Sequence, residues 1–258
     1  MKKKLFNKII LITFVITAGL FLFSAFGATR SALIVSGNYD SQFEMYDIGV
    51  VLNENGDAIA WRTYNRNKRD WEDTGEAKLF SSLKNIRYGV TYPETLSVSN
   101  SGQIDEYVRV TIYKYWLDKD GKKTFSLDPD LIQFDLVTGD NGWIEDENYS
   151  TKERTVLYYT KVLKGAESVR SGETTPAFSS AMTLDPKIKN YVKQTSEKVD
   201  EETGYTVITT EYIYDGCTFC FEVQVDAVQT HNAEDAALSA WGRTIVVADD
   251  GTLSLGKE

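Results

Sequence analysis

The only histidine of this chain, His231, and its two cysteines, Cys217 and Cys220, are the residues best suited to catalysis or metal binding. Histidine is the usual general base and metal ligand near neutral pH. A single copy excludes an HExxH zinc motif and any site that needs two imidazoles. The sequence also lacks a GxSxG motif, a P-loop and a GxGxxG phosphate cradle. We therefore interpret His231 as a polar residue just before a helix that starts near Asn232.

The two cysteines form a CxxC motif, which by spacing alone suggests a redox pair or half of a zinc site. The motif opens a run with a period of two, which places these side chains on one face of a strand: Cys217, Phe219, Phe221, Val223, Val225 and Ala227. In a strand, the Cα atoms of Cys217 and Cys220 would lie about 10 Å apart with side chains on opposite faces, beyond disulfide reach. We expect two free thiols, one of them buried.

Grouped carboxylates raise the question of calcium. Asp118-Lys119-Asp120-Gly121 is similar to the opening of a calcium loop but lacks the third acidic ligand and the distal glutamate. A hairpin turn is the better interpretation. The acidic clusters at 145–147 and 200–202 are predicted to be solvated loops. We expect no cofactor, with weak calcium binding as the alternative.

The N-terminal segment has the pattern of a secretory signal peptide. Four lysines, at positions 2, 3, 4 and 8, precede an apolar run over residues 9–26. Ala25 and Gly27 are small residues at the positions that a signal peptidase inspects, so we predict cleavage between Gly27 and Ala28. The alternative is an uncleaved anchor, because the run approaches the roughly 20 residues that span a bilayer. Both interpretations place the remainder outside the cytoplasm.

The predicted exported part is strongly acidic. Four of the 28 basic side chains lie in the first 28 residues, which hold none of the 38 carboxylates, so a formal charge of −14 remains. Nucleic acid and anionic membranes would be repelled. We expect no nucleic-acid partner and membrane contact only during export.

Turn signals such as Asn55-Gly56, Asn141-Gly142 and Asp215-Gly216 punctuate the chain at short intervals. Between the turns lie runs rich in Val, Ile, Thr, Tyr and Phe, at 43–52, 59–64, 94–99, 105–117, 131–137, 154–162, 177–184, 205–214, 217–228 and 243–248. Such a series favours an antiparallel sandwich or barrel. No Pro/Gly/Ser linker divides the exported part, which favours one domain.

Two short helices are predicted, and a third is a weaker possibility. Asp185 can cap a helix with Pro186 at its first position, and one face would then hold Ile188, Tyr191, Val192 and Thr195. A second helix starts at Asn232, whose side chain would accept from the Asp235 amide; Leu238 and Trp241 would share a face, and Gly242 would end the helix. The third would cover 77–84, with Phe80 and Leu83 inward.

The predicted strand 105–117 has two distinct faces. Tyr107, Tyr113 and Tyr115 lie on one face, and Val108, Val110, Ile112 and Trp116 lie on the other. Exposed tyrosines in a row would stack on sugar rings. Alternatively, the tyrosine face is covered by a second sheet or a helix, with Arg109 packed against a ring.

An apolar patch, Ala32, Leu33, Ile34 and Val35, follows the predicted cleavage site in an otherwise polar segment. The patch must pack on something after cleavage. It either pairs within its own domain or adds as a strand to a neighbouring molecule, where main-chain hydrogen bonds supply affinity.

Several sequence segments together resemble the TasA/camelysin family of exported proteins. This family is common in Gram-positive bacteria and is processed by a SipW-type signal peptidase. The segments lie at 29–33, 45–50, 100–102, 106–110, 221–229, 232–236 and 240–242. The resemblance implies a jelly-roll sandwich, secretion, and assembly into matrix fibres in which the N-terminal strand of one subunit completes the sheet of the next. Camelysin was described as a metalloprotease, but no motif in this chain supports protease activity.

The sequence thus predicts an all-β, antiparallel, jelly-roll-like β-sandwich with two or three short helices, preceded by a signal-peptide helix. The expected segments are the signal peptide 1–27, a leader or donor strand 28–42, and one sandwich domain 43–258. The predicted function is a non-enzymatic fibre subunit of the cell surface or biofilm matrix. Its partners would be copies of itself, an accessory matrix protein and a signal peptidase. The alternatives are a monomeric adhesin for glycans or host protein, and a camelysin-like metalloprotease.

Overall fold

The computed structural model describes residues 48–65, 70–74, 79–83, 85–166, 172–199 and 206–257. The chain divides into two units, Met1–Glu44 and Met45–Glu258, and every described residue belongs to the second. The predicted signal peptide, its cleavage site at Gly27 and Ala28, and the leader 28–42 lie outside the described residues. The predictions on these segments therefore stay predictions.

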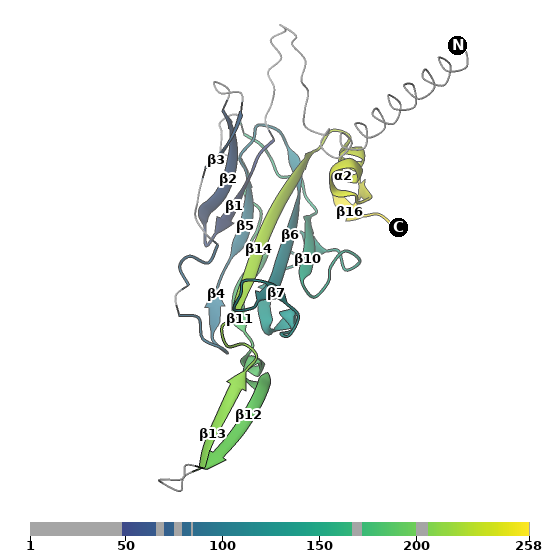
Figure 1. Ribbon diagram of the computed structural model, residues 1–258. Coiled ribbons are helices and arrows are strands. Elements are labelled where there is room, and N and C mark those ends of the chain that lie inside the picture. Colours follow the sequence, from purple (N-terminus) through teal and green to yellow (C-terminus); the bar gives the residue numbers. More distant parts are fainter. Residues whose placement is uncertain are drawn as a thin grey trace, which may run out of the picture. The chain divides into compact units, whose positions relative to one another are not determined.

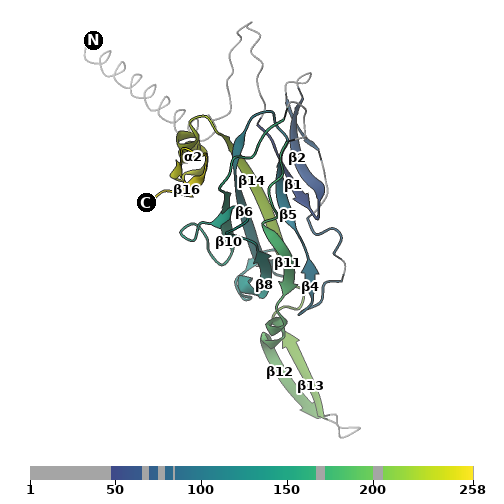
Figure 2. The ribbon, with the colours of Figure 1, turned by 180° about the vertical axis from the view of Figure 1, so that it is seen from behind.

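Antiparallel sheets build the second unit, and the chain is all-β as predicted (Figures 1 and 2). The first sheet has the order β3 (Asp70–Thr74), β2 (Asp57–Asn65), β1 (Val50–Glu54), β5 (Leu96–Asn100). The second has the order β14 (Thr218–Gln229), β6 (Glu106–Leu117), β10 (Arg154–Tyr159), β9 (Trp143–Glu145), with β7 (Lys123–Thr124) also on β6. The third has the order β4 (Thr91–Pro93), β11 (Ser179–Leu184), β8 (Ile132–Leu136). Two hairpins complete the described strands: β12 (Val192–Val199) with β13 (Thr206–Tyr212), and β15 (Ile245–Val247) with β16 (Leu253–Leu255).

The main core lies between the first two sheets, because alternate residues of their strands point inward. On β6 the predicted apolar face is confirmed, since Val108 and Val110 are fully buried. Trp143 is also fully buried, and its ring centroid lies 5.2 Å from those of Tyr159, which is tilted, and Phe178, which is edge-on. Main-chain bonds from Phe178 to Leu96 and from Thr175 to Val98, both 2.8 Å, connect β5 to the segment before β11. The first and third sheets are thereby joined.

Each of the ten predicted strand runs has a counterpart. β1 begins at Val50, and the earlier part of the predicted run 43–52 falls largely outside the described residues. Sequence reasoning missed six strands, namely β3, β4, β7, β9, β12 and β16. Four of these have two or three residues, too few to display a period.

The predicted helix after Asp185 is wrong beyond its first turn. Asp185 does cap it, accepting from the Lys187 amide at 2.8 Å, but the 3₁₀ helix η2 ends at Asn190. Val192 and Thr195, expected on a helix face, belong to β12 and pair with β13. Cross-strand pairing therefore overrides the local helical pattern.

The second predicted helix is present as α2 (Ala233–Trp241), and Gly242 ends it in the left-handed conformation at φ 64°. Two details were wrong. Asn232 is itself left-handed, so its side chain makes no cap bond, and its main-chain oxygen accepts from Ala236 instead. Leu238 is 54% exposed, because the buried face runs through Ala233, Ala237 and Trp241.

The weaker helix prediction over 77–84 fails where it can be checked, because residues 79–82 form turns. Phe80 is buried as expected, but at φ 61°, outside helical geometry. Leu83 is only half-buried. No helix in the described part of the chain is long and apolar enough to cross a membrane.

Helix α2 and the β15–β16 hairpin cover the outer face of the second sheet. Tyr107 and Tyr158 are buried there, with Tyr107 donating to the Gly251 carbonyl at 2.8 Å. A buried ion pair fixes this cover: Arg243 Nε lies 2.6 Å from Asp146 Oδ2, and both side chains are at most 3% exposed. Asp146 was expected in a solvated loop, so that prediction is wrong for this residue.

We predict that Arg243→Met destabilises the protein by about 3–5 kcal/mol, because it leaves the Asp146 carboxylate buried and unpaired. The double variant Asp146→Leu/Arg243→Met should recover much of that loss. Urea unfolding at pH 7 measures both values. Equal losses in the single and double variants would contradict this account.

Candidate functional site

The histidine and the cysteines do not converge on a reactive centre. His231 is exposed in the turn before α2, as predicted. The two thiols are free, also as predicted, but both are half-buried, so the expectation of one fully buried thiol is wrong. Burial raises the pKa of both Cys217 and Cys220. A raised pKa keeps a thiol protonated and weakens it as a nucleophile.

The acidic motif at 118–121 is a hairpin turn, as predicted. Asp118 Oδ1 accepts from the amides of Asp120 and Lys122, both at 2.9 Å, and the turn joins β6 to β7. No cluster of three or more potential metal-ligating His, Cys, Asp or Glu residues occurs among the described residues. The cluster 200–202 lies outside them.

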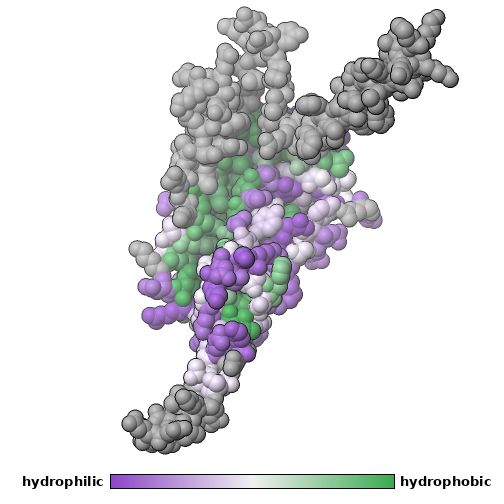
Figure 3. All heavy atoms as spheres, in the orientation of Figure 1, coloured by the Kyte–Doolittle hydropathy of each residue, from purple (hydrophilic) through white to green (hydrophobic). Residues whose placement is uncertain are grey.

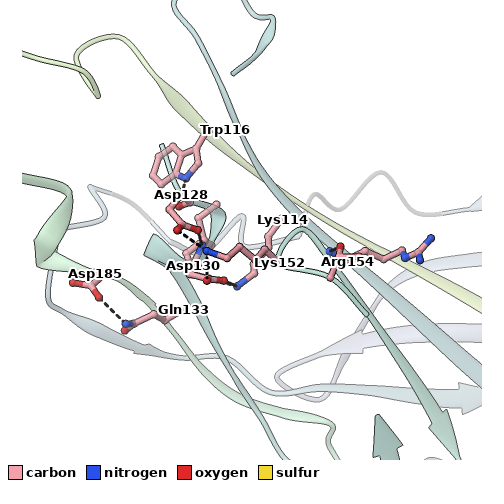
Figure 4. A network of polar contacts seen from close by, with 10 residues as sticks. Lys114, Trp116, Asp128, Asp130, Gln133, Lys152, Arg154 and Asp185 are labelled. Carbon is pink, nitrogen blue, oxygen red and sulfur yellow. Dashed lines mark hydrogen bonds and ion pairs between the residues drawn. The ribbon is translucent and has the colours of Figure 1, made fainter. Parts of the chain in front are cut away.

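A polar network surrounds the short helix η1 (Pro129–Leu131) and is drawn in Figure 4. Lys152 Nζ lies 2.7 Å from Asp128 and 3.2 Å from Asp130, and the Asp128 carbonyl accepts from the Trp116 indole at 3.1 Å. Lys152 lowers the pKa of Asp128. Lys114 Nζ lies 3.5 Å from Asp130, so two ammonium groups face the two carboxylates. The network fastens η1 beside Trp116.

The tyrosine face of β6 is covered at one end and partly exposed at the other, so each of the two interpretations holds for part of it. Tyr107 is buried beneath the C-terminal cover, and the Arg109 guanidinium lies 5.6 Å from the centroid of the Trp241 ring, as the second interpretation expects. Arg109 also forms an ion pair with Asp226 at 2.6 Å. Tyr113 and Tyr115 lie farther along the strand and are half-buried.

Tyr115 belongs to an aromatic patch that we define as Tyr113, Tyr115 and Phe125. Phe125 is 81% exposed, and Lys123 Nζ lies 5.4 Å from the ring centroids of both Tyr115 and Phe125. The Tyr115 hydroxyl donates to Glu222 at 2.5 Å, and this bond raises the pKa of Tyr115 to about 12. Sequence reasoning did not single out Phe125, because an isolated Phe in a polar loop carries no pattern.

The most distinctive feature is an edge of β14 with which no second described strand pairs. Its twelve residues pair with β6 in unbroken register from Thr218 to Gln229. Among the described strands, β6 is its only partner. An edge strand leaves alternate main-chain N–H and C=O groups available to another strand. We call this feature the acceptor edge.

Apolar side chains beside the acceptor edge are only half-buried. On β14 these are Phe221, Val223 and Val225, and they join Val50, Leu79, Phe134 and Leu136 at the margin of the core. Figure 3 shows a band of apolar surface along the flank where β14 faces the first sheet. Phe80 covers one part of the band, with its ring centroid 5.0 Å from that of Phe221. The period-two run predicted these residues to face inward, but their incomplete burial could not be seen in the sequence.

Glu106, the first residue of β6, is the least satisfied polar group in the core. It is 0% exposed, and neither carboxyl oxygen has a hydrogen-bond partner in the structure. The Gly49 N–H lies close enough to lower the pKa slightly but falls short of hydrogen-bond geometry. Desolvation dominates and raises the pKa of Glu106 to about 9. The carboxyl is therefore neutral at physiological pH.

Comparison with known proteins adds no family: no family model, curated protein or solved structure matches this chain.

We predict that Glu106→Gln stabilises the fold at pH 7 by about 3 kcal/mol, because the unfolded chain ionises Glu106 near pH 4.5 and the folded chain does not. The wild type is most stable, with respect to this group, below pH 4.5, and loses that stability as the pH rises toward 9. Urea unfolding from pH 4 to 9 measures the difference. Parallel stability curves for the two proteins would contradict this prediction.

Proposed function

We propose that this protein is an exported subunit of extracellular fibres at the cell surface or in a biofilm matrix, assembled by strand addition. The leader 28–42 of one subunit, through Ala32, Leu33, Ile34 and Val35, would pair with the acceptor edge of the next. The single observation that carries the proposal is the acceptor edge with its half-buried apolar flank. The jelly-roll topology and secretion belong to the same proposal, which includes no enzymatic step.

The apolar residues of the leader have the spacing that an added strand would need to cover the flank of the acceptor edge. An added strand turns alternate side chains toward the core, so either Ala32 and Ile34 or Leu33 and Val35 would cover the flank beside Val223 and Val225. Each choice places two apolar side chains against the half-buried band. The polar residues on both sides of the patch would remain at the ends of the added strand.

Two costs oppose assembly. Ordering the leader costs about 1–2 kcal/mol per residue, which main-chain hydrogen bonds and apolar burial must offset. The formal charge of −14 on each exported chain also opposes close approach. Mild acidification or added salt should therefore favour growth of the fibre.

We predict that deletion of residues 29–42 leaves a folded monomer that no longer polymerises, whereas the intact chain from Ala28 onward forms fibres. Electron microscopy over a range of concentration and pH measures assembly, and circular dichroism checks the fold. Formation of fibres by the deletion variant, or absence of fibres from the intact chain, would contradict the proposal.

A matched pair of variants tests the acceptor side of the same prediction. Val223→Lys places a charge on the half-buried face of β14, and Gln224→Lys places the same charge on the opposite, exposed face. Val223→Lys should block growth at this edge, and Gln224→Lys should assemble normally. Equal assembly by two folded variants would exclude β14 as the acceptor.

The second candidate function is glycan binding by a monomeric adhesin. The observation in its favour is the aromatic patch, where Phe125 is 81% exposed beside Tyr115. Aromatic faces stack on sugar rings. Glu222, bonded to Tyr115, and Glu153, bonded to Lys123, lie close by, and their carboxylates could accept hydrogen bonds from sugar hydroxyls.

We predict that, in this case, Tyr113→Ala/Tyr115→Ala and Phe125→Ala each lower affinity for a neutral polysaccharide at least tenfold while assembly stays unchanged. Binding to a glycan array, followed by calorimetry on the best ligand, measures this. An equal loss in a variant of the opposite end of β6, such as Arg109→Lys, would contradict a role specific to the aromatic patch.

A further inference from the structure

The point where the chain leaves β1 toward its N-terminus is closed by three elements, which we call the seam: Gly49, the loop 100–104 and Glu106. The Ser101 amide donates to the Gly49 carbonyl at 2.7 Å, and Val50 pairs with Asn100. A Cβ on Gly49 would lie 2.6 Å from Ser101 Oγ. A side chain at this position would force the Ser101 hydroxyl to move.

Apart from Glu106, the buried polar side chain at the seam is well satisfied. Asn100, fully buried, donates to the carbonyls of Ile104 at 2.8 Å and Leu163 at 3.1 Å, and accepts from the Gly102 amide at 2.7 Å. The main chain of Glu106 exchanges two hydrogen bonds with Leu163. Its carboxyl is thus an isolated unsatisfied group inside an otherwise well-bonded joint.

The charged groups packed around the seam do not relieve Glu106. Asp105, its neighbour, opposes ionisation and is itself held by Lys164 at 3.0 Å and the Gly165 amide at 3.0 Å. Glu173 accepts from the Lys164 amide at 3.2 Å. Within the described part of the chain, Glu106 forms no ion pair with any of these groups.

We propose that Glu106 is a proton-dependent latch on the seam: the joint is closed while the carboxyl keeps its proton, and it opens locally when the carboxyl ionises in water. Opening lets the carboxylate reach solvent and frees Gly49 from the loop 100–104. The latch rests on the burial and unsatisfied oxygens of the Glu106 carboxyl and on the contacts that close the seam. If the proposed function is correct, the latch lies at the end of β1 from which the chain runs toward the leader 28–42, so its opening would change how readily the leader reaches a neighbouring subunit.

The latch has a quantitative signature. The pKa of Glu106 is about 9 in the closed seam and near 4.5 once the carboxyl is exposed. The opening equilibrium must therefore rise about tenfold for each pH unit between about pH 5 and 9. Glu106→Gln, which cannot ionise, should open to the same extent at every pH.

Amide hydrogen exchange on the chain from Ala28 onward tests this between pH 5.5 and 8.5. The reporter is the Ser101 amide, bonded to Gly49, and the remote control is the Leu253 amide, bonded to Thr160 at 2.7 Å. The wild-type to Glu106→Gln ratio of exchange rates cancels base catalysis. We expect that ratio to rise about tenfold per pH unit at Ser101. We also expect the Ser101 amide to be less protected than the Leu253 amide at every pH, because global unfolding, which also exposes Glu106, is rarer than local opening. Glu145→Gln, which removes an exposed carboxylate, should behave as wild type.

Two results would overturn the latch. One is a constant wild-type to Glu106→Gln ratio at Ser101. The other is equal protection at Ser101 and Leu253 at every pH, which would mean that Ser101 exchanges only by global unfolding. If Glu106→Gln fails to fold, the protection factor of Ser101 in the wild type gives the same test, because it already divides out base catalysis: it must fall about tenfold per pH unit and stay below that of Leu253. Fibre growth is measured separately. Absence of fibres at every pH would defeat the proposed function and leave the exchange result to decide the latch.

Discussion

A β-sandwich must satisfy the main-chain hydrogen bonds of its outermost strands, and in this protein β14 is the strand on which that constraint acts most strongly. β14 is twelve residues long, contains no proline and pairs with β6 without a bulge. Proteins usually protect an edge by making it short, bulged or interrupted. Among the described residues, the protection of β14 consists of polar residues on the outer face, such as Glu222 and Gln224. An edge this long and regular, beside a half-buried apolar flank, is suited to receiving a strand.

The sequence predicted long elements well and short or non-local ones poorly. β6 and β14 were recognisable because a period of two persists over twelve residues in each. Val192 and Thr195 fit a helical spacing as well as a strand, and only pairing with β13 decides between them. Asn232 has the residue type of a helix cap, but its left-handed backbone removes the cap bond. Asp146 reads as solvated because its partner, Arg243, lies 97 positions away in the sequence.

Of the two parts of the candidate assembly site, the leader could be predicted from the sequence and the acceptor edge could not. The leader is visible as an apolar patch in a polar segment, whereas the acceptor edge depends on which strand ends a sheet, and that is a property of topology. Glu106 shows the same limit. A glutamate at the start of a strand is ordinarily solvated. Glu106 is buried here among segments distant in sequence, beside the Gly49 N–H and paired through its main chain with Leu163. Asp146 and Glu106 both carry buried carboxyl groups, but only Asp146 is paired with an arginine. This difference also depends on tertiary contacts and cannot be predicted from the local sequence.

The seam and the acceptor edge share one hydrogen-bonded ladder. Glu106 pairs with Gln229, the last residue of β14, and the Thr230 amide donates to the Asp105 carbonyl at 3.3 Å. Under the proposed assembly, a strand that extends along β14 therefore finishes beside the joint from which the receiving subunit's own leader departs. Dehydration of that end by the arriving strand disfavours ionisation of Glu106, whereas opening of the seam loosens the end of the ladder that must receive the strand. Opening of the seam and arrival of a strand on β14 are thus opposed through the same carboxyl, which under the proposed assembly would make fibre growth depend on pH beyond simple repulsion between acidic subunits.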